Sequence, residues 1–456
     1  MSSSASDRNL LVRDIALDGA RLDCRVVDGV VAELAAGLTR RAGEQVVDGA
    51  GGALLPGLHD HHVHAFAAAA AAGSLDLRGG ALPAPGQAPA PDSERDWVRG
   101  VGLGDDDATV ADLDRVWPAR PARVQHRSGA LWVLNTRAIE LLGDVLDPGE
   151  RADGRVWRGD ARLSEALGRL DPWDVEDDLR HWGQQLAARG VTGLTDATVG
   201  LEASSLAMVR AHLPQRVVSL GAEDDGLPVK VVAGDHGPAD GSDRWSELVT
   251  AVRAARERGR PVAVHAVSAA SLAMVLAALD DLGVVAGDRV EHAAVCDDAA
   301  ADRLAELGVV VVTQPSIAER RGRAMVDASD PEDRPWLWRI AGLRDRGVRV
   351  VLSSDAPYGD PDPWATISLS SSGLPADRSP WLHDQTISAR DALESYLTRP
   401  EDPAGPVRTV QPGAIADLCV LDAPLDVVLD RVAGGDTASP VRLTVVDGRV
   451  VSTRLD

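Results

Sequence analysis

Lysine is almost absent from this 456-residue sequence, because Lys230 is the only one and the other 46 of the 47 basic residues are arginine. Cysteine is scarce too: Cys24, Cys296 and Cys419 lie too far apart for a disulfide framework or a paired-cysteine zinc site. We therefore expect the thiols to be bystanders and the location to be cytoplasmic, where thiols stay reduced.

Long apolar runs are also missing. The longest candidate, residues 65–72, is a short alanine tract, well below the ~18 residues of a membrane-spanning helix. The first residues lack the charged start and apolar stretch of an export signal. A net charge of −23 repels phosphate backbones and anionic lipids. These features exclude nucleic-acid and membrane partners and favour a small-molecule substrate. The oligomeric state stays open, with a homodimer as one option.

The composition is that of a globular protein, with 45% hydrophobic and 26% charged residues. Apolar β-rich runs alternate with amphipathic segments such as 243–259 and 268–283, which have apolar residues at three- and four-residue spacing. Eight such runs predict a (β/α)8 barrel, with a doubly wound open sheet as the alternative. The runs are 53–58, 191–195, 216–220, 229–232, 262–264, 288–291, 309–313 and 348–353.

The two chain ends share another pattern. Residues 9–53, 416–422 and 441–451 carry alternating apolar runs broken by Asp-Gly turns, which predict a small antiparallel β-module. We expect residues 1–53 and 391–456 to form a flanking β-sandwich and residues 54–390 to form the barrel. Residues 65–190 do not fit one βα unit and are predicted to be an insertion that covers the barrel mouth.

Polar residues that could bind a metal or take part in catalysis lie in or after the predicted strands. In the segment LLPGLHDHHVH, strand alternation puts Asp60, His62 and His64 on one face and His59 and His61 on the other. Further candidates lie in or after later strands, on the side where barrel enzymes place their chemistry. These candidates are Lys230, His265, His292 and Asp355. Each one alone has a structural explanation, but their joint occurrence in strand order favours a metal site.

Several motifs together resemble the amidohydrolase superfamily of metal-dependent hydrolases, in the branch called amidohydrolase family 3. PGLHDHHVH resembles the PGFxDxHxH of that branch, LSSDAP resembles its GSDxP, and GAIADLCVLD resembles its closing G-x-x-ADLxVLD. VTQPSIA resembles the stretch after its seventh strand. The resemblance spans nearly the whole chain and implies a (β/α)8 barrel with a flanking β-sandwich.

The resemblance also implies a ligand set for two divalent ions, zinc first and manganese or iron as alternatives. His62, His64 and Asp355 would hold one ion, His265 and His292 the other, and Lys230, carboxylated by CO2, would bridge both. A carbamate forms only from a neutral amine, which arginine does not supply. A metal-bridging hydroxide would attack the carbonyl carbon of an amide, cyclic amide or N-acyl compound. Asp355 would move the proton, with Lys230 and His292 as further catalytic residues.

Alternatives remain at this point. The same scaffold with one metal could act as an esterase, a lactonase or an unusual deaminase, although Ser268 stands where deaminases of the superfamily carry a glutamate. A non-enzymatic binding protein would normally have lost ligands. Substrate contacts could come from mouth residues, or these could be ordinary surface residues in an arginine-rich chain. They are His126, Arg127, Trp132, His236, Arg320, Arg321 and Tyr358.

Overall fold

The computed structural model describes residues 8–77, 82–84, 97–104, 108–126, 130–157, 159, 162–163, 165–167, 175–221, 227–232, 243–373 and 384–454. The chain forms two compact units, one made of residues 1–65 and 183–456 and the other of residues 66–182. The described part of the chain includes no helix long and apolar enough to cross a membrane.

Eight parallel strands form the central part of the first unit, and they confirm an α/β fold. One sheet has the order β13-β12-β6 and another the order β14-β15-β16-β17-β18. The bounds are β6 (Leu58–Val63), β12 (Val191–Asp196), β13 (Arg216–Ser219), β14 (Val229–Val232), β15 (Val262–Ala266), β16 (Arg289–His292), β17 (Val310–Thr313) and β18 (Arg349–Leu352). Backbone contacts join the neighbouring edges of the two sheets: a parallel bridge joins Val63 to Ala356, and Lys230 N donates to Leu220 O at 2.7 Å.

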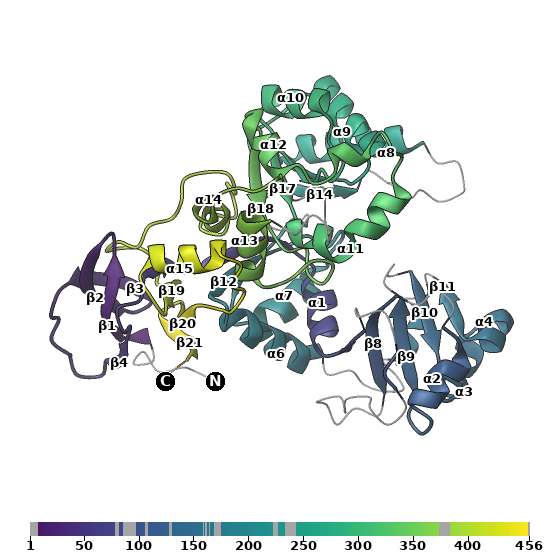
Figure 1. Cartoon of the computed structure of the whole chain (residues 1–456), viewed down its shortest axis with the longest axis horizontal. Helices are drawn as coiled ribbons and strands as arrows, with labels where there is room; N and C mark the ends of the chain where they lie inside the picture. Colours follow the sequence, from purple (N-terminus) through teal and green to yellow (C-terminus); the bar gives the residue numbers. More distant parts are fainter. Residues whose placement is uncertain are drawn as a thin grey trace. The chain divides into compact units, whose positions relative to one another are not determined.

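Helices between these strands cover the second sheet, as Figure 1 shows for the green and teal segments. Residues such as Val252, Val275 and Leu304 pack on the strand residues Val264, Val290 and Val311 in one hydrophobic core. The amphipathic segments 243–259 and 268–283 are indeed helices. The helices of this region are α7 (Ala203–His212), α8 (Arg244–Glu257), α9 (Ala269–Leu282), α10 (Asp298–Leu307), α11 (Pro315–Ala328), α12 (Ile340–Asp345), α13 (Pro363–Ser372) and α14 (Ala389–Glu394).

The first predicted strand, 53–58, is wrong in its placement. Leu54–Pro56 forms β5 and pairs antiparallel with β19 (Leu418–Leu421), in a different sheet from β6. The histidines therefore lie within a strand rather than after one. Gly57 allows the crossing between sheets, because a Cβ there would lie 2.1 Å from the Thr192 side chain. The apolar pattern of residues 53–58 did not indicate that the run is divided between two strands, β5 and β6, which lie in different sheets.

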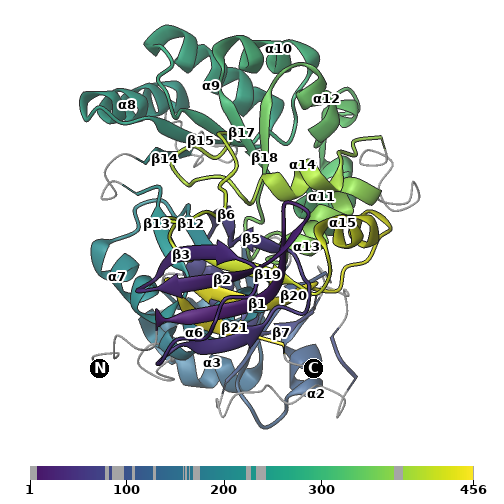
Figure 2. The same cartoon turned by 90° about the vertical axis from the view of Figure 1, so that its left-hand side faces the viewer.

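Both chain ends contribute to two further sheets. One has the order β3-β2-β1-β4, with β1 (Leu10–Leu17), β2 (Ala20–Val27), β3 (Val30–Ala35) and β4 (Gln45–Asp48). The other has the order β21-β20-β19-β5, with β20 (Val441–Val446) and β21 (Arg449–Thr453), and α15 (Leu425–Ala433) follows β19. Figure 2 shows the purple strands β1–β3 beside the yellow strands β19–β21, and side chains from both sheets share one core.

The expectation of a purely antiparallel module needs one correction. Strand β4 runs parallel to β1. Because β3 and β4 lie at opposite edges of the sheet and point the same way, residues 36–44 must carry the chain back across it. No hairpin turn can make that connection.

The second unit has its own mixed sheet, with the order β11-β10-β9-β8-β7. Its strands are β7 (Leu75–Asp76), β8 (Val98–Leu103), β9 (Ala122–His126), β10 (Leu131–Leu134) and β11 (Arg155–Trp157). Its helices are α2 (Val110–Val116), α3 (Thr136–Leu142) and α4 (Pro148–Asp153), while α1 (Ala65–Ala72) and α6 (Val175–Ala187) include the junctions between the two units.

Asn135 connects three segments of this unit, and its side chain is fully buried. Its Oδ1 accepts from Ala138 N (2.9 Å) and Ala122 N (2.8 Å), and its Nδ2 donates to Trp117 O (3.0 Å) and Arg120 O (2.8 Å). Asn135→Ala removes all four of these buried hydrogen bonds, so we expect a loss of about 3–4 kcal/mol in the free energy of unfolding, measured by urea denaturation.

Thr136→Ala is the matched control for this prediction. It removes a hydrogen bond from Thr136 Oγ1 to Asp114 Oδ2 (2.6 Å) that is exposed to solvent. We expect it to cost less than about 0.5 kcal/mol, as surface substitutions usually do. Equal losses for the two variants would contradict the structural role of Asn135.

Candidate metal centre

Strand β6 follows the predicted alternation of its histidines. On one face, His59 Nε2 bonds Thr195 Oγ1 (2.8 Å) and His61 Nε2 bonds Thr398 Oγ1 (2.9 Å). His62 points the other way, toward Asp355. The alternation thus separates two structural histidines from the histidines of the candidate site.

Asp60 holds two backbone segments of the site together, one at His62 and one at Ser354. It is buried, and its Oδ1 accepts from the backbone N–H groups of His62 and Ser354, both at 3.2 Å. One carboxylate thereby ties β6 to the segment that leads into Asp355.

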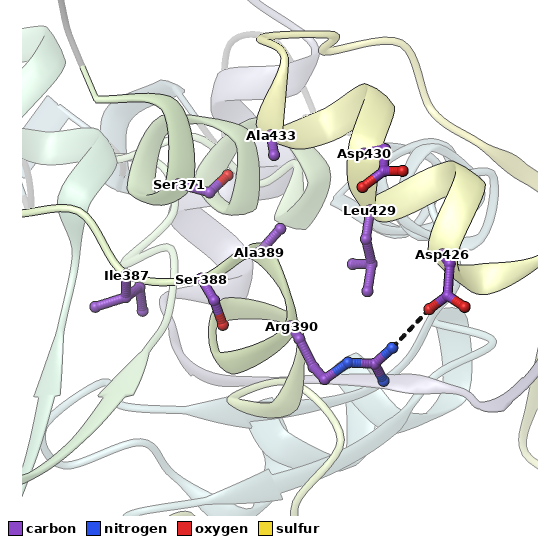
Figure 3. A pocket seen from close by; sticks show the side chains of 9 residues that line it. All are labelled: Ser371, Ile387, Ser388, Ala389, Arg390, Asp426, Leu429, Asp430 and Ala433. Carbon is purple, nitrogen blue, oxygen red and sulfur yellow. Dashed lines mark hydrogen bonds and ion pairs between the residues drawn. The ribbon is translucent and has the colours of Figure 1, made fainter.

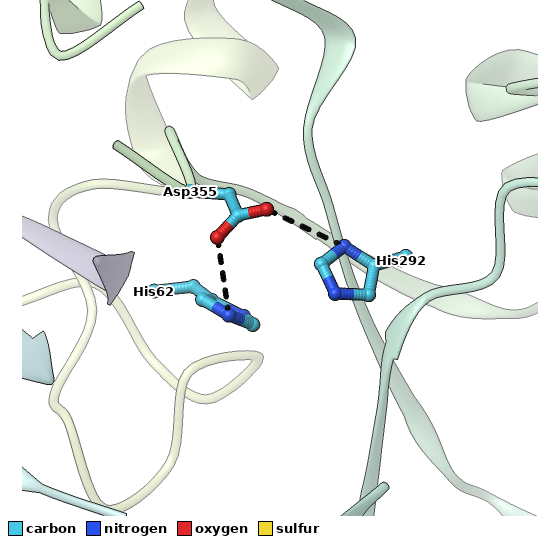
Figure 4. A group of neighbouring side chains, drawn as sticks. All are labelled: His62, His292 and Asp355. Carbon is cyan, nitrogen blue, oxygen red and sulfur yellow. Dashed lines mark ion pairs between the residues drawn. The ribbon is translucent and has the colours of Figure 1, made fainter. Parts of the chain in front are cut away.

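Three side chains form the centre of the site, as Figure 4 shows. Asp355 Oδ1 lies 3.5 Å from His62 Nε2, and Asp355 Oδ2 lies 4.0 Å from His292 Nδ1. One ligand atom from each residue falls within 4.8 Å of the others, and all three residues are buried. His64 adds a further donor, because its Nε2 lies 3.2 Å from Asp355 Oδ1.

The remaining two predicted ligands border this group. Lys230 Nζ lies 3.2 Å from His62 Nε2, and the Lys230 side chain is buried. The rings of His265 and His292 meet edge to face with centroids 4.5 Å apart. The structure therefore brings all six predicted ligands together from five strands, although each ligand role stays a prediction.

Two site residues have unusual backbone conformations. His292 has φ +74° and Asp355 has φ +51°, which lie in the left-handed region that residues other than glycine rarely adopt. Such conformations cost about 1–3 kcal/mol each and persist where the surrounding structure imposes them, most often at functional sites. Here they occur where strand β16 ends and just beyond β18.

Sequence reasoning missed the side chains that hold the imidazoles. His62 Nδ1 bonds Glu291 Oε2, His292 Nδ1 bonds Gln314 Oε1 (2.6 Å), and His64 Nδ1 bonds Thr198 Oγ1 (3.2 Å). Strand alternation would place Glu291 opposite its neighbour His292, but the left-handed φ of His292 breaks that rule. No motif in the sequence marks Gln314 or Thr198 as partners of a distant histidine.

Burial controls the charge of the imidazoles and of the amine. It lowers the pKa of His62 to about 4 and that of His292 to about 3, so both rings are neutral and can offer a lone pair. Burial also lowers the pKa of Lys230, although Glu291 and Asp355 partly oppose the change. Burial alone would raise the pKa of Asp355, but the imidazoles around it outweigh burial and hold that pKa below its usual range.

The donor set fits a divalent cation. Within the described residues, Asp355 Oδ1 is buried and accepts no hydrogen bond, although two Nε2 atoms lie 3.2 and 3.5 Å away. Acceptor atoms that converge without a hydrogen between them need a positive charge to stabilise them. Neutral imidazoles with one carboxylate are ligands typical of zinc and related metals.

The predicted substrate residues divide into several groups. Tyr358 is 40% exposed, and its ring lies edge-on to His64 with centroids 5.8 Å apart. Arg320 instead donates to Gly359 O (2.7 Å) and pairs with Asp360 (2.6 Å), so it holds the loop after Asp355. Arg321 lies on α11, and its side chain is outside the described part, as are residues Arg127 and His236.

His126 and Trp132 belong to the second unit. Both are buried, and the guanidinium groups of Arg99 and Arg123 lie over the Trp132 ring at 5.3 and 5.1 Å from its centroid. The structure gives them a packing role there, and their contact with a substrate stays a prediction.

A hollow of about 440 Å³ lies apart from the histidine cluster, among α13, α14 and α15 (Figure 3). Arg390 and Asp426 form an ion pair across it at 2.9 Å. Its lining also includes Ser371, Ile387 and Leu429, and it contains none of the six predicted ligands.

Comparison with known proteins agrees with the geometry. A sequence model of the amidohydrolase family matches residues 45–452. N-substituted formamide deformylase of Arthrobacter pascens is 23% identical over 478 residues, which cover 83% of this chain and 85% of that enzyme.

Two solved structures share the fold. An uncharacterized metal-dependent hydrolase from Pyrococcus horikoshii matches with a TM-score of 0.66 and 20% identity, over 91% of this chain and 97% of its own. N-isopropylammelide isopropylaminohydrolase from Burkholderia multivorans matches with a TM-score of 0.52 and 18% identity, over 98% of each chain.

Proposed function

Because the chain belongs to the amidohydrolase family, we propose that it is a binuclear metal-dependent hydrolase that cleaves a carbon–nitrogen bond. The observation that carries this proposal is a cluster of one lysine, four histidines and one aspartate. His62, His292 and Asp355 form its centre. Lys230, His64 and His265 each lie next to one member of that centre. Their chemistry matches the ligand set of a two-metal site.

The proposed scaffold is a closed (β/α)8 barrel with a flanking β-sandwich made from residues 1–53 and 391–456. Two contacts support closure: the bridge between Val63 and Ala356 and the hydrogen bond from Lys230 N to Leu220 O. The core shared by the two terminal sheets supports the sandwich. Residues 54–390 would be the barrel, with the insertion at about 65–190.

In the proposed site, His62, His64 and Asp355 would hold one ion, His265 and His292 would hold the other, and a carboxylated Lys230 would supply further anionic oxygens. Bound zinc ions would polarise the substrate carbonyl and lower the pKa of water. Lys230 is suited to carboxylation because burial lowers the pKa of its amine, which favours the neutral form that reacts with CO2.

Asp355 is the proposed proton shuttle. Its pKa lies below the usual range despite burial, because His62, His64 and His292 surround it, so the carboxylate is ionised and its oxygens are unprotonated. A metal-bound water, being more acidic than free water, would be the proton donor to it. Asp355 would then pass the proton to the leaving nitrogen. The exposed ring of Tyr358 beside His64 would contact the substrate.

The proposed substrates are N-formyl or N-acyl amines and cyclic amides. The deformylase of Arthrobacter pascens favours this class, since its name gives N-substituted formamide as its substrate. Arg320 pairs with Asp360, so the proposal does not need a substrate carboxylate.

One observation favours a second candidate, a single-metal esterase, lactonase or deaminase. Within the described residues, the tightest ligand group consists of only His62, His292 and Asp355. These residues alone could hold one ion while Lys230 remains a free amine beside His62.

Metal removal tests both candidates. We expect dialysis against a strong chelator to lower the turnover of an N-formyl amine by at least a factor of about 1,000, because the ions supply most of the charge stabilisation. Zinc should restore turnover, with saturation at two equivalents per chain measured by elemental analysis. Saturation at one equivalent, or faster turnover of lactones and aminopyrimidines than of amides, would favour the second candidate. Full activity without metal would reject both.

A further inference from the structure

Two buried charged side chains, Arg289 and Glu291, are linked by hydrogen bonds to His62 of the candidate site. Arg289 Nε donates to Glu291 Oε1 at 2.5 Å, and Glu291 Oε2 bonds His62 Nδ1. All three side chains are at most 1% exposed. Arg289 alone would balance the charge of the Glu291 carboxylate. The additional hydrogen bond between Glu291 and His62 is therefore not needed for charge balance and suggests a separate role.

The chemistry of the contact determines the state of the ring. An ionised carboxylate only accepts hydrogen bonds, so His62 Nδ1 must carry the hydrogen and Nε2 keeps its lone pair. The ion pair with Arg289, at 2.5 Å, keeps the Glu291 carboxylate ionised. The Nε2 atom is the one that lies 3.5 Å from Asp355 Oδ1 and 3.2 Å from Lys230 Nζ.

His292 offers an internal comparison. Its Nδ1 bonds Gln314 Oε1, while Gln314 Nε2 donates to Val312 O (3.1 Å) and Ser353 Oγ (3.0 Å), which sets the orientation of that amide. The two imidazoles therefore have the same tautomer. Of these two rings, His62 has a carboxylate as the hydrogen-bond partner of Nδ1, whereas His292 has an amide. A carboxylate strengthens a metal-binding imidazole more than an amide does.

We propose that Glu291, supported by Arg289, is a positioning residue that fixes the tautomer and direction of His62 and raises the affinity of its Nε2 for the metal. Gln314 fixes His292 without adding charge. This inference rests on the metal site proposed above, and it adds a role for two residues outside the ligand set.

The first experiment measures zinc affinity by competition with a chromophoric chelator. We expect Glu291→Gln, which keeps the shape of the side chain but removes its charge, to weaken binding by about 10- to 100-fold. Thr398→Val is the matched control, because it removes the partner of His61 on the opposite face of the same strand. We expect its affinity to stay within about twofold of the wild-type value.

The second experiment observes the His62 ring directly. Nitrogen NMR of metal-free protein with 15N-labelled histidine reports which ring nitrogen of His62 carries hydrogen, and a His62→Asn variant identifies the signal. We expect the Nδ1–H tautomer. An Nε2–H tautomer, or equal zinc affinity of Glu291→Gln and wild type, would overturn this inference alone. Failure of the wild-type protein to bind zinc would reject the proposed metal site itself.

Discussion

Replacing Asp355 with asparagine is expected to lower kcat/KM by a factor of about 100 to 10,000, the usual range for loss of a general acid–base group. The amide has nearly the shape of the carboxylate but cannot take a proton from water. It would also turn either an NH2 group or a neutral oxygen toward the Nε2 atoms of His62 and His64, now 3.5 and 3.2 Å from Oδ1. Steady-state hydrolysis of an N-acyl amine measures the effect.

Asp280→Asn provides the control for this prediction. Asp280 forms an exposed ion pair with Arg303 on the helices that cover the sheet. Its loss should leave kcat/KM within about twofold, because exposed pairs contribute little. If Asp355→Asn kept more than a tenth of the wild-type activity, another group would have to move the proton.

Lys230→Arg is expected to reduce activity at least about a thousandfold and to lower the metal content from two ions to one or none, because a bridging anion would be replaced by a cation. The substitution keeps a positive charge, but a guanidinium does not lose its proton in proteins and cannot capture CO2. The fixed charge would also lie against His62 Nε2, now 3.2 Å from Nζ. Elemental analysis and turnover, measured together, check both parts.

Two further measurements separate the carbamate from other roles of this lysine. Native mass spectrometry of the wild-type protein should show the mass of one CO2 on the Lys230 peptide. Lys230→Ala should regain part of its activity with a short carboxylic acid, which can supply the missing anionic oxygens. An unmodified amine together with full activity of Lys230→Arg would refute the carbamate.

Much of the fold could be predicted from the sequence because strands and helices differ in the local spacing of their apolar residues. The run at 229–232 matches β14 residue for residue, and the helices α8 and α9 lie within the predicted amphipathic segments. The resemblance to the amidohydrolase family is confirmed. The first strand was misplaced and the direction of β4 was missed because both depend on pairing with strands distant in the sequence. Strand β5 pairs with β19 and β4 pairs with β1, and local patterns do not specify such partners.

The candidate site shows the same division. The histidines and Asp355 could be found because strand ends gather at one side of a parallel sheet, and Lys230 because the composition has removed every other lysine. Glu291 could not be found, since strand alternation puts it on the face opposite its neighbour His292, which was the predicted ligand. His292 departs from regular strand geometry through its left-handed φ. Gln314 follows β17 and reaches His292 through a hydrogen bond that only the folded chain defines.

The short step from β5 to β6 has a consequence for biosynthesis. Strand β5 ends at Pro56 and pairs with β19, Gly57 N bonds Asp417 O (2.8 Å), and β6 with its histidines begins one residue later. During translation, the amino-terminal histidines emerge from the ribosome early, but the strand that anchors them emerges only after residue 421. The strand that carries the histidines can therefore become fully ordered only after residues 418–421 have been synthesised.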